Sequence, residues 1–131
     1  MTSRIAVLGI DAVEPEVVAR FWCRVLDWTV VERSAGGGVS IGPVGGARPE
    51  IDVLPVPEHK AVKNRMHLDV RAEDVSTAAE LERLFALGAR RADVGQAAGA
   101  DQVVLADPEG NEFCLLSRSV QNPDDSEKPP P

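Results

Sequence analysis

The spacing of apolar residues along the first half of the chain changes twice. Residues 4–10 form a short apolar run rich in branched side chains, which predicts a buried strand. Between residues 14 and 27 apolar residues recur at spacings of three and four, which predicts an amphipathic helix with Pro15 in its first turn. The spacing then returns to two, and further strands are predicted over residues 28–33, 39–41 and 50–54.

The second half of the chain repeats this order. A strand is predicted over residues 64–71 and a helix over residues 74–88, and three strands follow at residues 89–94, 102–106 and 112–118. A proline-containing turn joins the last two strands, and Gly110 is expected to take a left-handed conformation there. The sequence therefore predicts two strand–helix–three-strand modules.

The modules span residues 1–57 and 63–118 and together form one domain, residues 1–118. The remaining residues, 119–131, are rich in charged residues and proline, and predict a disordered tail.

Local signals mark the predicted second helix. Thr77 and Glu80 have the spacing of a capping box, and Gly88 marks the end of the helix. The apolar face of this helix is predicted to consist of Ala78, Leu81, Leu84 and Phe85.

Composition and charge narrow the function classes. With 44% hydrophobic and 27% charged residues, the chain has the composition of a soluble globular protein. A net charge of −7 with dispersed basic residues argues against a nucleic-acid partner. The first apolar run is too short and too interrupted for a signal peptide or a membrane span, so a cytoplasmic protein without a membrane partner is expected. Cys23 and Cys114 are expected to be reduced thiols.

His67 is the residue with the most chemical interest in the predicted strand 64–71. Alternation along that strand places Met66, Leu68 and Val70 on one side, and Arg65, His67 and Asp69 on the other. His67 therefore belongs to a polar face, where Asp69 is expected either to orient the imidazole or to pair with Arg65.

Three stretches of sequence together resemble the vicinal oxygen chelate superfamily, and in particular its small glyoxalase-like and bleomycin-resistance-like proteins. They are FWCRVLDW at the end of the first helix, NRMHLDV at the start of the second module, and DPEGNEFCLL near its end. The resemblance covers residues 4–118. It implies an α+β fold in which two βαβββ modules form a curved, open, barrel-like sheet cleft with the helices packed outside. It also implies a homodimer.

The resemblance further implies positions for a metal site. Metal-dependent members place one ligand on the first and last strand of each module. These positions fall on Glu50, His67 and Glu112, and the fourth falls on Ala6 or Val7, which cannot bind a metal. No tightly bound cofactor is therefore expected, although Glu50, His67 and Glu112 could in principle hold a divalent ion such as zinc, nickel, manganese or iron.

Three functions follow from these residues. The first is a small-molecule-binding protein whose cleft, lined by Glu50, His67, Glu112 and Cys114, holds a small metabolite or an antibiotic-like ligand without a metal. The second is a metal-dependent lyase or isomerase of the glyoxalase type. The third is a metal-free isomerase or lyase in which a desolvated glutamate acts as general base beside His67. In the metal-free enzyme the general base would be Glu50 or Glu112, and the residues expected to be catalytic are Glu112 and His67. Cys114 is expected to line the cleft as a small apolar group, not to act as a nucleophile.

Overall fold

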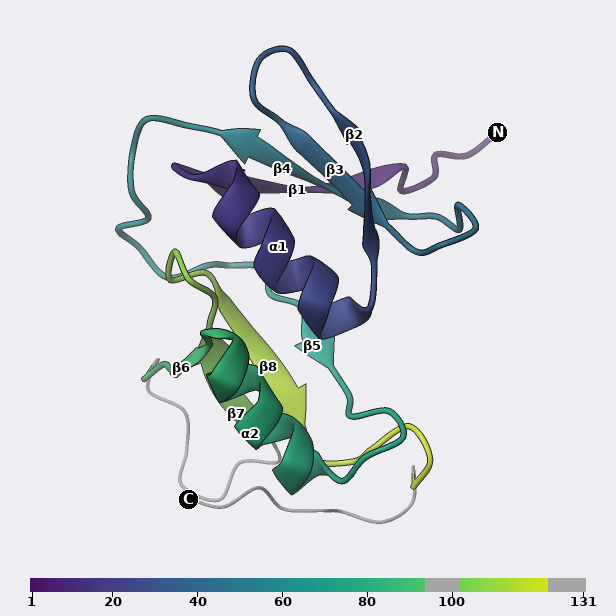
Figure 1. Ribbon diagram of the computed structural model, residues 1–131, viewed down its shortest axis with the longest axis vertical. Coiled ribbons are helices and arrows are strands. Elements are labelled where there is room, and N and C mark those ends of the chain that lie inside the picture. Colours follow the sequence, from purple (N-terminus) through teal and green to yellow (C-terminus); the bar gives the residue numbers. More distant parts are fainter. Residues whose placement is uncertain (94–101, 123–131) are drawn as a thin grey trace. The chain divides into compact units, whose positions relative to one another are not determined.

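A computed structural model describes residues 1–93 and 102–122 of the chain (Figure 1). The chain divides into two compact units, Met1–His59 and Lys60–Pro131. Each unit contains one helix and one four-stranded sheet. Among the described residues, no helix combines the length and apolar character needed to cross a bilayer.

The first unit is a strand–helix–three-strand module. Its elements are β1 (Val7–Ala12), α1 (Pro15–Leu26), β2 (Thr29–Arg33), β3 (Val39–Gly42) and β4 (Glu50–Pro55). The strands lie in the order β1-β4-β3-β2, and the pairing of β1 with β4 is parallel while the other pairings are antiparallel. The helix that follows β1 makes this parallel pairing possible, because parallel strands need a crossover connection.

The core of the first unit lies between α1 and one face of its sheet. Pro15 occupies the first turn of α1, where its missing N–H costs no hydrogen bond, and Asp27 ends the helix in a left-handed conformation. The apolar stripe of α1 packs against alternate residues of the central strands, which include Ile51 and Val53. The predicted stripe is confirmed at its buried members Val18, Phe21, Trp22 and Val25.

The second unit has the same topology. Its elements are β5 (Asp69–Val70), α2 (Thr77–Leu87), β6 (Arg90–Arg91), β7 (Gln102–Ala106) and β8 (Glu112–Leu116). The strands lie in the order β5-β8-β7-β6, and β5 pairs with β8 in parallel. The order and the direction of pairing are those of the first unit, element for element. The predicted α+β class and the repeated module are therefore confirmed.

The second unit departs from the sequence prediction in its first strand. A strand over residues 64–71 was expected, but β5 contains only Asp69 and Val70. Met66, expected on the apolar side of the strand, is 84% exposed. The parallel contact does extend one residue back, because the Cys114 N–H donates to the Leu68 carbonyl over 2.9 Å. His67 therefore lies just before the strand and not within it.

The start of α2 also differs from the prediction. Ser76, not Thr77, caps the helix, and its hydroxyl accepts a hydrogen bond from the Ala79 N–H over 3.1 Å. Thr77 is fully buried and donates to the carbonyl of Ser117, which directly follows β8. Glu80 instead forms an ion pair with Arg83. The prediction of a capping box at Thr77 and Glu80 is therefore wrong. Gly88 ends the helix in a left-handed conformation, as predicted.

The apolar face of α2 is narrower than expected. Leu81 and Leu84 are buried, but Ala78 is exposed and Phe85 is 37% exposed. The Phe85 ring lies under the Arg91 guanidinium, 5.6 Å from its carbon, so this ring is partly covered by a cation and not by the core.

The turn between β7 and β8 forms as predicted. Gly110 has φ 89°, and the buried Asp107 carboxylate accepts hydrogen bonds from the N–H groups of Glu109 and Asn111. This turn fixes where β8 begins and hence the position of Glu112.

The first residues of the predicted tail belong to the folded unit. Ser119 is fully buried, and the Val120 N–H donates to the Ala72 carbonyl over 2.8 Å. The Gln121 side-chain amide donates to the Val75 carbonyl. The predicted tail boundary at residue 119 is thus too early, and residues 123–131 lie outside the described residues.

Candidate functional site

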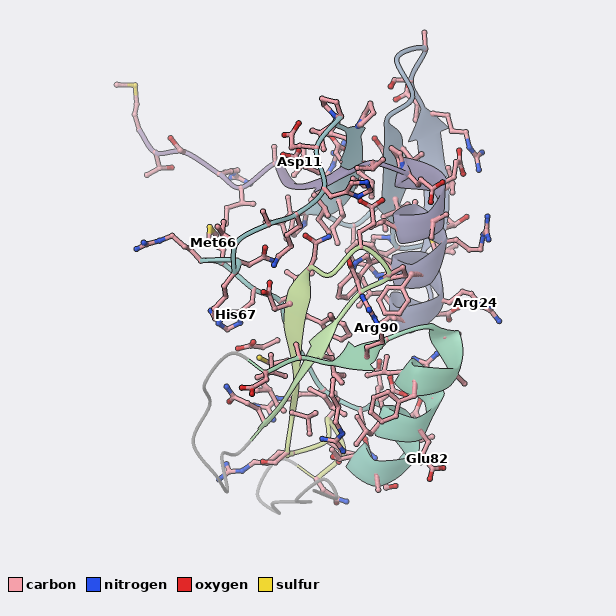
Figure 2. All side chains as sticks on the ribbon, turned by 90° about the vertical axis from the view of Figure 1, so that its left-hand side faces the viewer. Asp11, Arg24, Met66, His67, Glu82 and Arg90 are labelled. Carbon is pink, nitrogen blue, oxygen red and sulfur yellow. The ribbon has the colours of Figure 1, made fainter. Side chains whose placement is uncertain are left out.

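The sheet of the second unit has one covered face and one partly open face. Phe113 and Leu115 of β8 are fully buried on the face where α2 packs. Cys114, between them, points to the opposite face and is paired in register with Asp69 of β5. Figure 2 shows His67 on the side of the sheet away from α2. The open face therefore gathers polar side chains from β8 and from the segment leading into β5.

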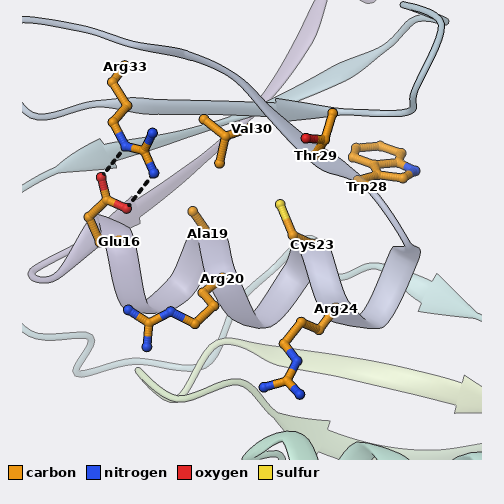
Figure 3. A pocket seen from close by; sticks show the side chains of 9 residues that line it. All are labelled: Glu16, Ala19, Arg20, Cys23, Arg24, Trp28, Thr29, Val30 and Arg33. Atoms are coloured by element: carbon orange, nitrogen blue, oxygen red, sulfur yellow. Dashed lines mark hydrogen bonds and ion pairs between the residues drawn. The ribbon is translucent and has the colours of Figure 1, made fainter.

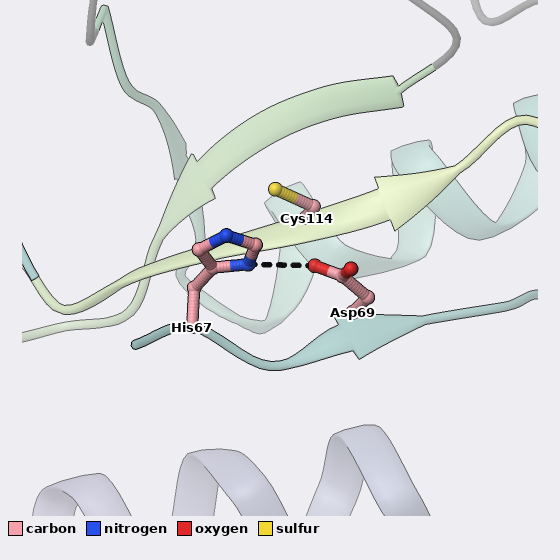
Figure 4. Close-up of side chains that lie close together, drawn as sticks. All are labelled: His67, Asp69 and Cys114. Carbon is pink, nitrogen blue, oxygen red and sulfur yellow. Dashed lines mark hydrogen bonds and ion pairs between the residues drawn. The ribbon is translucent and has the colours of Figure 1, made fainter. Parts of the chain in front are cut away.

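His67 and Asp69 are joined by a short hydrogen bond. The imidazole Nδ1 lies 2.7 Å from a carboxylate oxygen of Asp69, and the two side chains are 40% and 42% exposed (Figure 4). Because an ionised carboxylate only accepts hydrogen bonds, Nδ1 carries the proton in this contact. The bond fixes the ring orientation and leaves Nε2 available to another partner. This contact confirms that Asp69 orients His67.

Cys114 is the buried member of the same group. Its thiol lies beside His67 and Asp69 in Figure 4. Burial, together with the negative charge of Asp69 and a hydrogen bond to it, raises the pKa of the Cys114 thiol to about 11. A thiol with this pKa is neutral at physiological pH, so Cys114 has no activation as a nucleophile.

Glu112 has partners that the sequence did not reveal. Lys60 Nζ lies 2.8 Å from one carboxylate oxygen, and the Asn64 N–H donates to the other over 3.1 Å. The side chains of Lys60 and Glu112 are only 19% and 11% exposed. Burial by itself would raise the pKa of Glu112, but the hydrogen bonds from Lys60 and Asn64 outweigh it and hold the pKa below its ordinary value. Glu112 is therefore an anion whose charge is already compensated.

Lys60 could not have been selected from the sequence. It lies 52 residues before Glu112, in a polar loop with other charged residues, and no periodicity marks it. Only the folded course of this loop brings its ammonium to the start of β8.

Glu50 belongs to the first unit. Its carboxylate forms an ion pair with Arg48 over 3.2 Å, and its side chain is 13% exposed. In the parallel pairing of β1 with β4, Val7 is the residue in register with Glu50. The position left open in the sequence as Ala6 or Val7 is therefore occupied by Val7, an aliphatic residue without a metal-binding atom. His67 and Glu112 lie in the other unit, and a grouping of Glu50 with them stays a prediction.

The metal site implied by the resemblance does not fit these residues as they stand. Val7 offers no donor atom, and the Glu112 carboxylate is held by an ammonium ion and a backbone N–H. A metal at Glu112 would have to displace Lys60 from a contact that is largely shielded from solvent.

The structure brings together a different set of donor atoms. Within the described residues, His67, Asp69 and Cys114 form a group in which one potential metal-binding atom from each lies within 4.8 Å of the others. The alternation of residues 64–71 already placed Asp69 on the side of His67, but only an orienting or ion-pairing role was expected for Asp69. The register of β5 and β8 brings Asp69 next to Cys114.

A separate pocket of about 360 Å³ lies on the first unit, along α1 and β2 (Figure 3). Its rim carries the ion pair between Arg33 and Glu16, in which Nε lies 2.7 Å from the carboxylate, and Trp28 lies at the other end. Cys23 lines this pocket. Burial raises the pKa of its thiol, and the positive charge of Arg33 opposes that shift. None of these residues was assigned to a site from the sequence.

Comparisons with known proteins agree with this topology. A family model described as a glyoxalase-like domain matches residues 7–116. No significant match was found among curated proteins.

Similar solved structures have low sequence identity. A glyoxalase-related enzyme from Fulvimarina pelagi is 22% identical, with 88% of each chain covered and a TM-score of 0.61. TnmS3, an antibiotic-binding protein from a Streptomyces species, is 17% identical over 88% of this chain and 95% of the other, with a TM-score of 0.60. A variant of the fosfomycin resistance protein FosX from Listeria monocytogenes, in complex with Mn(II) and 1S,2S-dihydroxypropylphosphonic acid, is 15% identical over 94% and 96% of the chains, with a TM-score of 0.62. At these identities the likeness shows the fold.

Proposed function

Because the chain belongs to the glyoxalase-like domain family, we propose that it is a small-molecule-binding protein that holds a small metabolite or an antibiotic-like ligand. The ligand would lie on the open sheet face that carries His67, Glu112 and Cys114. Glu50, which belongs to the first unit, stays a predicted ligand-binding residue. In this proposal no metal is held by Glu50, His67 and Glu112.

The ion pair between Lys60 and Glu112 is the observation that carries this proposal. In a metal-dependent relative the carboxylate at this position would be a ligand, but here an ammonium ion 2.8 Å away already neutralises it. Together with the aliphatic Val7 beside Glu50, this contact argues against metal binding at two of the four family positions. What is left is a polar surface suited to hydrogen bonding.

The chemistry of the open face suggests how a ligand would be held. With Nδ1 bonded to Asp69, His67 presents Nε2 as a hydrogen-bond acceptor, and its side chain is accessible. Cys114 and its register partner Val104 are buried and provide an apolar floor. A ligand with a hydroxyl or N–H group next to an apolar portion matches this surface. The binding of an antibiotic by TnmS3, a protein of similar fold, supports this class of ligand.

A thermal-shift screen tests the proposal. The protein, purified without an affinity tag and treated with chelator, is screened against antibiotics, including fosfomycin and bleomycin, and against small metabolites. A ligand present at 100 times its Kd stabilises the fold by about 2.7 kcal/mol, which raises Tm by roughly 5–10 °C in a domain of this size.

His67→Ala should reduce the shift given by a compound that binds. Met66→Ala is the matched control, because Met66 is the adjacent residue and is 84% exposed. A compound that stabilises the protein only after a divalent metal is added, or whose shift is unchanged by His67→Ala, would count against the proposal.

A metal-dependent lyase or isomerase is the second function to consider, because the FosX variant of similar fold was solved with Mn(II). It would require Glu112 to leave Lys60. The metal-free acid–base enzyme with Glu112 as its base is less favoured, because a lowered pKa makes Glu112 a weaker base at neutral pH and leaves it no proton to donate. Activity that appears with Mn²⁺ and is lost in Glu112→Gln would support the metal-dependent enzyme.

The homodimer implied by the resemblance and the cytoplasmic location expected from the sequence stay predictions. Light scattering on the eluting peak of a size-exclusion column would test the first, since the monomer mass is 14.0 kDa.

A further inference from the structure

The side chains of His67, Asp69 and Cys114 combine three kinds of metal-binding atom in a small volume. One potential ligand atom from each lies within 4.8 Å of the others. Figure 4 shows the imidazole and the carboxylate extending from one chain segment toward the thiol on the neighbouring strand. Two ligands of one tetrahedral zinc ion lie about 3.3–3.8 Å apart, because metal–ligand bonds are about 2.0–2.3 Å long. Small side-chain rotations would bring the three atoms to one ion.

The backbone holds this arrangement in place. Asp69 and Cys114 are register partners in the parallel pairing of β5 with β8, so their side chains share one face. The hydrogen bond from the Cys114 N–H to the Leu68 carbonyl ties the residue next to His67 to the same strand. Asp69 and Cys114 are therefore positioned by the pairing of β5 with β8, and His67 lies in the segment directly before β5.

The exposure of the three side chains suits an ion with an open position. Cys114 lies buried at the base, while His67 and Asp69 are 40% and 42% exposed. An ion could enter from the open face, and a water molecule or a ligand could complete its coordination. Lys63 is the nearby cation that acts on the Cys114 thiol. The positive charge of Lys63 favours the Cys114 thiolate but repels a bound metal cation. Because the Lys63 side chain is exposed, solvent and salt screen this repulsion.

From this geometry we infer that His67, Asp69 and Cys114 form a binding site for a borderline-soft divalent cation of the zinc class. A thiolate and an imidazole favour Zn²⁺ or Co²⁺ over Mn²⁺, Mg²⁺ or Ca²⁺, which prefer oxygen ligands. On binding, the Cys114 thiol releases its proton to solvent and the thiolate sulfur bonds to the metal, so one proton is released for each ion bound. No redox change accompanies this step.

This site goes beyond the proposed function and uses other donors than Glu50 and Glu112. Small-molecule binding is measured in chelator-treated protein, so it can fail or succeed independently of this inference. If the ion is present, its open coordination position faces the same surface as the proposed ligand.

Titration with Co²⁺ tests the site, because a cysteine ligand gives a thiolate-to-cobalt absorption band in the near ultraviolet. Tag-free, chelator-treated protein should show the band and saturate at one ion per chain, and Zn²⁺ should displace the cobalt. Cys114→Ser should abolish the band, whereas Cys23→Ser, which changes the cysteine of the other unit, should retain it.

Two further variants separate this site from the one implied by the family. His67→Ala should weaken cobalt binding at least tenfold, and since His67 is exposed this variant tests the site even if Cys114→Ser does not fold. Glu112→Gln should keep the absorption band. The inference is overturned if the wild-type protein binds no cobalt, if the band persists in Cys114→Ser, if His67→Ala binds cobalt as tightly as the wild-type protein, or if Glu112→Gln abolishes the band.

Discussion

The ammonium of Lys60 lies 2.8 Å from the carboxylate of Glu112, and both side chains are largely shielded from solvent. Glu112 occupies the start of β8, where the sequence predicted a residue of the functional site. Its second oxygen accepts the Asn64 N–H. The loop before β5 is therefore tied to the start of β8 by this single carboxylate.

Breaking this pair should destabilise the protein. In Lys60→Met the Glu112 carboxylate loses its cation while staying in a poorly hydrated position, and we expect a loss of about 1–3 kcal/mol. Lys63→Met is the matched control, because Lys63 lies in the same loop but is exposed and donates to the Asn64 carbonyl. Urea denaturation monitored by circular dichroism measures the free energy of unfolding of both variants. Adding Glu112→Gln to Lys60→Met should recover part of the loss, and equal losses in Lys60→Met and Lys63→Met would contradict this account.

The lowered pKa of Glu112 predicts a loss of stability in acid. Because the folded-state pKa lies below the unfolded value of about 4.3, the unfolded chain binds more protons in this range, so stability falls as pH falls. The contribution is complete above the unfolded pKa and is lost as pH drops through the folded one. Thermal melts between pH 6 and pH 3 should show a shallower decline for Glu112→Gln than for the wild-type protein. Parallel declines would show that Glu112 does not carry this dependence.

The two cysteines should differ in reactivity. The pKa of Cys114 is raised to about 11, so at pH 8 roughly one Cys114 thiol in a thousand is ionised, and its burial slows attack further. Cys23, which is partly exposed in the pocket of the first unit, should react with iodoacetamide first. Asp69→Asn removes the negative charge beside Cys114, lowers its pKa and should speed its alkylation. Mass spectrometry of tryptic peptides over time reads out both sites, and faster labelling of Cys114 in the wild-type protein would contradict the prediction.

The cap of α2 provides a test of local structure away from the site. Ser76→Ala removes the hydroxyl that accepts the Ala79 N–H and should cost about 0.5–2 kcal/mol of stability. Ser3→Ala, at an exposed position before β1, is the control and should change nothing measurable. A thermal or urea melt distinguishes the two variants. A neutral effect of Ser76→Ala would mean that water replaces the cap without loss.

The repeated module could be predicted because the apolar residues of each helix and strand follow the spacing typical of that element. The helices show a stripe at spacings of three and four, the strands between them show alternation, and Gly88 and Gly110 take the left-handed conformations expected of them. The start of the last strand at Glu112 was predicted correctly because the turn before it carries its own signals, whereas this strand ends at Leu116 and not at residue 118.

The errors occurred where partners distant in sequence decide the structure. The spacing of Thr77 and Glu80 predicted a helix cap, but the Thr77 hydroxyl donates to the carbonyl of Ser117, 40 residues later. The predicted strand at His67 is too long, because its alternation extends back to residue 64, whereas only Asp69 and Val70 pair in register with β8. The partner of Glu112 was missed for the same reason, since Lys60 differs from other loop lysines only in the folded protein.

The local partner of His67 could be predicted, unlike that of Glu112. Asp69 is two residues away on the same side of the chain, so alternation alone places the carboxylate near the imidazole. Contacts within one segment follow from sequence spacing, whereas contacts between segments require the fold.

Calorimetric titration of Mn²⁺ into tag-free, chelator-treated protein tests the central claim most directly. Manganese prefers oxygen donors and therefore reports on Glu50 and Glu112 more than on the thiol of Cys114. If Lys60 holds Glu112, the wild-type protein should show no stoichiometric uptake of Mn²⁺. Uptake of one Mn²⁺ per chain by the wild-type protein, abolished by Glu112→Gln and by His67→Ala, would contradict the account.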